Sequence, residues 1–75
     1  MLNILIVEDD VTIRELLSYN LKKNFKILEA NSAEEAMEVC EHNNIHLILL
    51  DWQHSNIPKL FLGFPFLVHK KNFQW

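Results

Sequence analysis

Acidic residues follow two apolar runs of this chain, and they are the residues best suited to chemistry. Glu8 and Asp9 come after residues 3–7, which read NILIV. Asp51 comes directly after residues 47–50, which read LILL. Runs of apolar residues without polar alternation are typical of strands buried on both faces, as in a parallel sheet. Parallel neighbours end at one edge, about 4.8 Å apart, so these three carboxylates are expected to converge.

Converging carboxylates favour the binding of a hard cation. Two carboxylates 4 Å apart repel by about 4 kcal/mol at an effective dielectric near 20. Mg²⁺ suits such a place because it takes one or two carboxylates together with water and phosphate oxygens. It also neutralises charge while a phosphoryl group passes to an acceptor. Ligands of open α/β sheets bind at this same edge, where the strand order reverses.

The residues after the first run predict an amphipathic helix. Apolar residues recur at i, i+3, i+4 and i+8 from Ile13 onward, which is the spacing of one helical face. Asp10 precedes this face and is expected to cap the helix. The buried face is expected to hold Ile13, Leu16, Leu17 and Leu21, with Arg14, Glu15, Lys22 and Lys23 pointing outward.

A second strand and a second helix are expected to follow. Residues 26–30 read KILEA and indicate a short strand. Ser32 and Glu35 have the spacing of a capping box that starts a helix ending near Asn43. This order, with short joins, requires right-handed crossovers and a parallel sheet. The buried face of the second helix is expected to hold Ala33, Ala36, Met37 and Cys40, which makes Cys40 a core residue and not a nucleophile.

Three segments together resemble the receiver domain of bacterial response regulators. They are residues 4–10 (ILIVEDD), 13–17 (IRELL) and 47–52 (LILLDW). The resemblance spans residues 2–53 and includes the interval of roughly forty residues that two crossover units occupy. It implies an α/β fold, a flavodoxin-like doubly wound parallel sheet in which this chain supplies only the N-terminal β-α-β-α-β portion. The family's strand order, 2-1-3-4-5, is taken from the resemblance.

The resemblance also implies a phosphorelay function. Asp51 matches the phosphoacceptor, which takes the phosphoryl group of a phosphohistidine on a sensor histidine kinase or a phosphotransfer protein. Glu8 and Asp9 match the acid pair that holds Mg²⁺, and the backbone carbonyl of Gln53 matches a further metal ligand. Such a domain is a switch, not an enzyme. The pair Asp51-Trp52 is similar to members that control transcription, so transcription regulation is expected of the ancestral full-length protein.

Composition changes abruptly after Asp51. Residues 1–51 carry ten acidic and four basic residues, a balance of −6, whereas residues 52–75 carry three lysines and no acid, a balance of +3. The resemblance ends here as well, because Ser55 stands where the family has proline and Lys59 where it has glycine.

We therefore expect a partial receiver domain over residues 1–53 and an irregular, apolar, non-family tail over residues 54–75. Our hypothesis for the tail is a frameshift near codon 53. Lys70 and Lys71 are expected to have no strand-end context, so the family's later lysine is expected to be missing. The third strand is then an exposed edge. We therefore expect this chain to be a truncated receiver domain whose ability to accept a phosphoryl group is impaired.

Net charge, the lack of a targeting segment and the positions of the histidines also bear on the class of protein. A net charge of −3 gives no reason to expect direct binding of nucleic acid. The first residues lack the pattern of a signal peptide, and no run is long enough for a transmembrane segment, so a cytoplasmic protein is expected. His42 and His46 are expected to be surface polar residues. An alternative remains, a non-phosphorylated interaction module that binds a partner or self-associates through the apolar run of residues 60–68.

Overall fold

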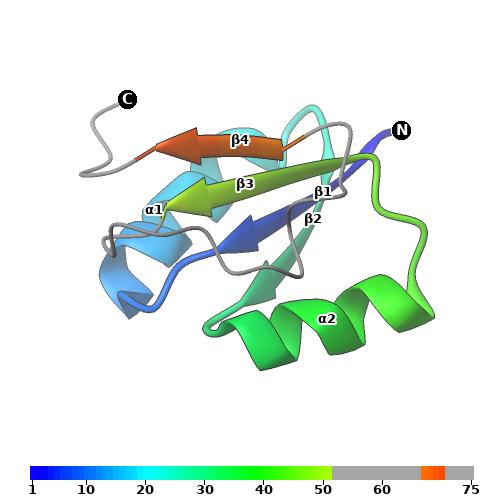
Figure 1. Cartoon of the computed structure of the whole chain (residues 1–75). Coiled ribbons are helices and arrows are strands. Elements are labelled where there is room, and N and C mark those ends of the chain that lie inside the picture. The colour runs from blue at the N-terminus through cyan, green and yellow to red at the C-terminus, as the bar shows by residue number, and fades with distance from the viewer. Residues whose placement is uncertain (52–66, 71–75) are drawn as a thin grey trace.

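The computed structural model describes residues 1–50 in full, and Asp51 and residues 67–70 through their backbone (Figure 1). The strands of the described part all run parallel, in the order β2-β1-β3-β4. The predicted β-α-β-α-β arrangement and its parallel sheet are confirmed. In chain order the elements are β1 (Asn3–Val7), α1 (Val11–Leu21), β2 (Lys26–Ala30), α2 (Ala33–His42), β3 (Leu47–Asp51) and β4 (Leu67–Lys70).

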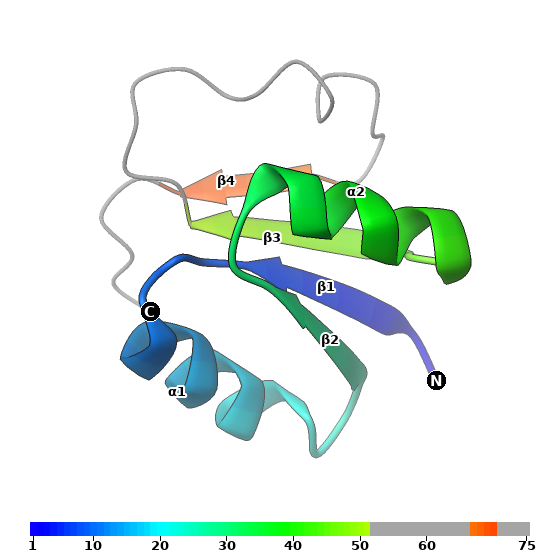
Figure 2. The ribbon, with the colours of Figure 1, turned by 90° about the horizontal axis from the view of Figure 1, so that it is seen from below.

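The two helices cover opposite faces of the sheet (Figure 2). Leu5 and Val7 of β1 pack toward α2, while Ile4 and Ile6 pack toward α1. Successive side chains of a strand point to opposite faces, so a strand covered on both sides must be apolar throughout. This is the reason why β1 is an unbroken apolar run, and all four of these side chains are buried.

Two residues expected in the buried faces of the helices are exposed. Leu16 of α1 is 60% exposed and Met37 of α2 is 44% exposed, so both expectations were wrong. The buried side of α1 is centred on Leu17 instead, and that of α2 on Ala36. A short helix on a flat sheet buries a narrow stripe, and the flanking positions of the apolar pattern stay in water.

The tail contributes a strand that the sequence did not predict. Leu67–Lys70 pair parallel with β3, so among the described strands β3 lies between β1 and β4 and is no edge. The expectation of an irregular tail is therefore wrong at these four residues. An open strand edge offers unpaired N–H and C=O groups, and a β-prone segment such as Leu67-Val68 can satisfy them. Residues 52–66 and 71–75 lie outside the described part.

Both helices begin with the predicted caps. Asp10 Oδ1 accepts a hydrogen bond from the backbone N–H of Ile13 at 3.1 Å, and Ser32 Oγ accepts one from Glu35 at 3.1 Å. The Glu35 carboxylate reaches back to the N–H of Asn31 at 3.3 Å, one residue before the cap. These bonds satisfy donors that a helix leaves open in its first turn. Neither α1 nor α2 is long and apolar enough to cross a bilayer.

Candidate functional site

The strand order reverses between β1 and β3. The chain leaves β1 through α1 to reach β2 on one side, and α2 then carries it past β1 to β3 on the other side. Val7 and Leu50 are register partners, so Glu8 follows its strand at the level where Asp51 ends β3. Open α/β sheets bind their ligands in the crevice at such a point. We call Glu8, Asp9 and Asp51 the acid edge.

Glu8 is fully buried and is held by its own turn. Its backbone N–H donates to the carbonyl of Ala30 on β2 at 3.0 Å, which extends the sheet by one residue. Its Oε1 accepts a hydrogen bond from the backbone N–H of Asp10 at 2.8 Å. A buried carboxylate needs such donors, because its removal from water is costly. These bonds fix the direction in which the chain leaves β1.

Arg14 was expected to point outward, and that expectation was wrong. Its Nη1 donates to the backbone carbonyl of Glu8 at 2.8 Å, and its Nε lies 3.2 Å from Oε1 of Glu29 on β2. Its side chain is only 16% exposed. The spacing gives a signal for this position, since Arg14 precedes the buried Leu17 by three residues and shares its side of α1. Arg14 therefore joins the turn after β1 to α1 and β2.

The two aspartates after Glu8 differ in their surroundings. Asp10 caps α1 through the N–H of Ile13, which confirms the structural role expected of it. Asp9 is exposed to solvent in the same turn. The carboxylate of Asp9 is therefore accessible to an ion from solution, whereas the side chain of Glu8 is buried.

The donor chemistry of the acid edge fits Mg²⁺. Its three side chains offer only carboxylate oxygens, and Mg²⁺ selects oxygen ligands and keeps several waters. Thiol and imidazole ligands, which favour zinc or copper, are not among them. Within the part of the chain whose side chains the structure describes, no group of three or more His, Cys, Asp or Glu residues is close enough to hold an ion. The backbone carbonyl predicted as a further ligand belongs to Gln53, which lies outside the described residues.

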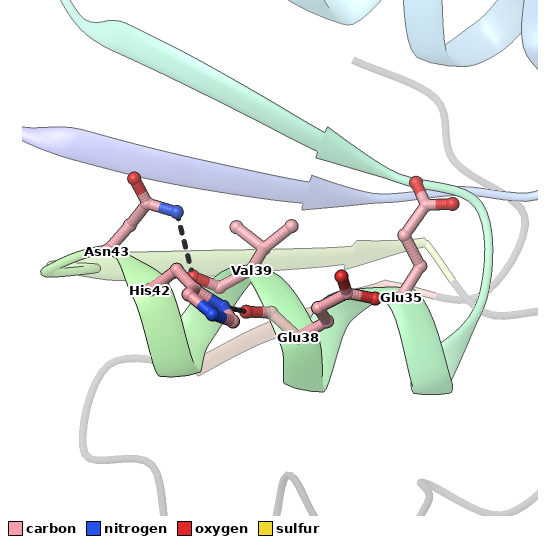
Figure 3. A pocket seen from close by; sticks show the side chains of 5 residues that line it. All are labelled: Glu35, Glu38, Val39, His42 and Asn43. Carbon is pink, nitrogen blue, oxygen red and sulfur yellow. Dashed lines mark hydrogen bonds between the residues drawn. The ribbon is translucent and has the colours of Figure 1, made fainter.

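A hollow of about 530 Å³ runs along α2, separate from the acid edge (Figure 3). In this hollow, the side chains of His42 and Asn43 bond backbone carbonyls of the last turn of α2, at Glu38 and Val39. The bond to Val39 satisfies one of the carbonyls that the end of a helix leaves open. The polar side chains of His42 and Asn43 in this hollow thus bond the backbone of α2, and we assign no binding or catalytic role to the hollow. It is lined by Glu35, Glu38, Val39, His42 and Asn43.

His46 has a structural contact of its own. Its Nδ1 accepts the backbone N–H of Asn3 at 2.9 Å, and its backbone N–H donates to the Asn3 carbonyl at 2.9 Å. The side chain of Asn3 also donates to the carbonyl of Asn44 at 2.8 Å. Both His42 and His46 are exposed, as the sequence predicted. These contacts fasten the loop before β3 to the start of β1, at the rim opposite the acid edge.

The fold and the acid edge define a doubly wound α/β domain with carboxylates at its switch point. The model of the response regulator receiver domain family matches residues 4–60, more than half of the chain. The chain belongs to this family, as the resemblance predicted. No curated protein and no solved structure matched it in the corresponding searches.

Membership of this family indicates the general role of the chain. Receiver domains are phosphoacceptors in two-component signalling and act as switches rather than as enzymes. They interact with histidine kinases or phosphotransfer proteins and typically bind Mg²⁺. The matched segment includes β1, β3 and the acid edge, and it extends seven residues past the boundary at residue 53 that the sequence suggested.

Proposed function

We propose that Asp51 is the phosphoacceptor of this receiver domain. A carboxylate oxygen of Asp51 attacks the phosphorus of a partner's phosphohistidine, the N–P bond breaks, and the imidazole leaves with a proton from solvent. The product is an acyl phosphate on β3. The observation that supports this proposal is the register of β1 with β3, which puts the end of the acceptor strand beside the turn that carries Glu8 and Asp9.

We propose that Glu8, Asp9, Asp51 and the carbonyl of Gln53 hold Mg²⁺ for this reaction. When bound, the ion neutralises negative charge on the transferring phosphoryl group. Asp9 is the accessible ligand of the turn, because it is exposed. Glu8 orders the turn through its bonds to Asp10 and Arg14, so that its carboxylate keeps a constant position.

Competence is expected to be reduced in this chain. Ser55 and Lys59 replace the proline and the glycine that the family has after its acceptor. The alternative, a non-phosphorylated interaction module that binds a partner through the apolar run of residues 60–68, stays a hypothesis, because most of that run lies outside the described residues.

Tryptophan fluorescence tests the proposal. Trp52 adjoins Asp51 in the sequence, and Trp75→Phe removes the second tryptophan. In this background, Mg²⁺ and the phosphoryl mimic beryllofluoride are expected to change the emission of Trp52. Asp51→Asn is expected to abolish the response.

Asp10→Asn is the matched control for this titration. It removes one acid next to the acid edge, yet asparagine caps a helix as well as aspartate does. Its response should equal that of the parent protein. An unresponsive parent, or an equal response with Asp51→Asn, contradicts the proposal.

A further inference from the structure

The C-terminal end of α1 presents an exposed surface that combines apolar and basic side chains. Leu16 and Tyr19 are large exposed side chains, and both lie outside the buried side of α1, which is centred on Leu17. The amines of Lys22 and Lys23, which directly follow α1, lie 5.3 and 5.9 Å from the centre of the Tyr19 ring. We call Leu16, Tyr19, Lys22 and Lys23 the basic face.

The helix α2 presents an exposed surface of the opposite charge. Glu34, Met37 and Glu41 recur at i, i+3 and i+7, which places them on one side of the helix. Glu38 follows Glu34 by one turn on the same side. All four are exposed, whereas Ala36 on the sheet side of α2 is fully buried. We call these four exposed residues the acidic face, in which one apolar side chain lies among three carboxylates.

The two faces cannot meet within one molecule. The helices α1 and α2 cover opposite faces of the sheet, and each turns its buried side toward the sheet (Figure 2). The basic face and the acidic face therefore point away from each other. Within the residues whose side chains the structure describes, the lysines of the basic face and the glutamates of the acidic face form no ion pair. A surface of matching charge is thus available to each face on a second copy of the chain.

We propose that the basic face of one copy docks on the acidic face of another. Tyr19 and Met37 supply the apolar contact, since tyrosine and methionine are enriched at protein interfaces. The charges around them set orientation and specificity more than affinity. The two faces differ, so the contact is head-to-tail and leaves one face of each copy open to the next. Two short helix faces make a weak, transient interface, and its charges lie at the surface, so salt weakens it.

Sedimentation velocity at low ionic strength, over a range of protein concentrations, tests this contact. The parent is expected to associate as its concentration rises, and high salt should reverse the association. Lys23→Glu and Glu38→Lys each place like charges opposite one another, and either is expected to weaken association about tenfold. Lys26→Glu is the matched control, because it makes the same change of charge at an exposed position of β2, outside both faces. It should associate as the parent does.

A mixture of the two variants separates the contact from an effect of net charge. Lys23→Glu keeps its acidic face and Glu38→Lys keeps its basic face, so an equimolar mixture is expected to recover association. The mean net charge of this mixture equals that of the parent. Both substitutions are at exposed positions, so the midpoint of urea unfolding should be unchanged in each variant.

The contact does not involve Asp51 and is independent of the proposed function. A parent that stays monomeric up to millimolar concentration overturns the proposal. So does a mixture that fails to associate, or a Lys26→Glu variant that associates as weakly as Lys23→Glu. Association that survives both charge reversals and high salt also overturns it, and points to the apolar run of residues 60–68 as the contact instead.

Discussion

Arg14 donates a 2.8 Å hydrogen bond from Nη1 to the backbone carbonyl of Glu8. The same guanidinium lies 3.2 Å from the carboxylate of Glu29. One side chain of α1 thus joins the turn after β1 to β2. The carboxylate of Glu8 is positioned by this turn, so the geometry of the acid edge depends on a residue that contributes no ligand to it.

Arg14→Ala is expected to destabilise the fold by about 1.5–3 kcal/mol, the range for hydrogen bonds that involve a charged group. The Glu29 carboxylate is 40% exposed, and its share should be small. Urea unfolding measures the change. Arg14→Lys keeps the charge without the planar fork and should recover only part of the loss. A loss no greater than that of Lys22→Ala, an exposed change at the C-cap of the same helix, speaks against this role.

Leu16 and Leu17 provide a matched pair for the corrected face of α1. Leu17 is 5% exposed and Leu16 is 60% exposed. Leu17→Ala is expected to cost about 2–5 kcal/mol, because it leaves a cavity between α1 and the sheet. Leu16→Ala should change the free energy of unfolding by less than about 0.5 kcal/mol. Equal losses for the two variants would mean that α1 packs through the face first inferred from the sequence.

Ser32 caps α2 through the N–H of Glu35. Ser32→Ala removes the acceptor and should lower stability by about 1 kcal/mol. Ser32→Asp restores an acceptor and places a negative charge at the helix N-terminus, so its stability should match or exceed that of the parent. The comparison uses the midpoint of urea unfolding. Identical midpoints for all three proteins would exclude a contribution from this cap.

Burial raises the pKa of the Cys40 thiol. As pH rises, the thiol of the unfolded chain therefore loses its proton at a lower pH than the thiol of the folded chain does. The stabilising contribution of Cys40 is therefore complete below the ordinary thiol pKa and is lost as pH rises through the raised pKa. Alkylation requires the thiolate, so iodoacetamide should modify Cys40 more slowly in the native protein than in urea at one pH. Mass spectrometry measures both rates, and equal rates would contradict burial of this thiol.

The sequence predicted most of this fold because its signals are local. The strands are indicated by unbroken apolar runs, and the helices by the helical spacing of their apolar residues and by their N-cap residues. The short loops between these elements allow only a few topologies. The exposures of Leu16 and Met37 escaped prediction, since periodicity gives the centre of a helical face but not its width. The site was predictable at the level of strand ends, through Glu8, Asp9 and Asp51.

The remaining parts of the site depend on contacts between distant segments. The spacing of Arg14 from Leu17 indicates its side of α1, but its partner is a backbone carbonyl, which no residue type reveals. Lys70 reaches its position through a pairing with β3 that joins segments sixteen or more residues apart. Lys70, which was expected to have no strand-end context, ends β4 only because of that pairing. Arg14 is a cation beside the acid edge, and charge balance at a predicted acidic site is the signal that points to it.

Transfer of a phosphoryl group from a small donor is the most direct test of the central claim, that Asp51 accepts phosphate with Mg²⁺ at the acid edge. Intact-mass measurement after incubation with phosphoramidate is expected to show one added phosphoryl group, dependent on Mg²⁺ and released by hydroxylamine as an acyl phosphate should be. Asp10→Asn should be labelled as the parent is, and Asp51→Asn should remain unlabelled. A parent that takes up no phosphoryl group in Mg²⁺, or an Asp51→Asn variant labelled to the same extent, would contradict the account.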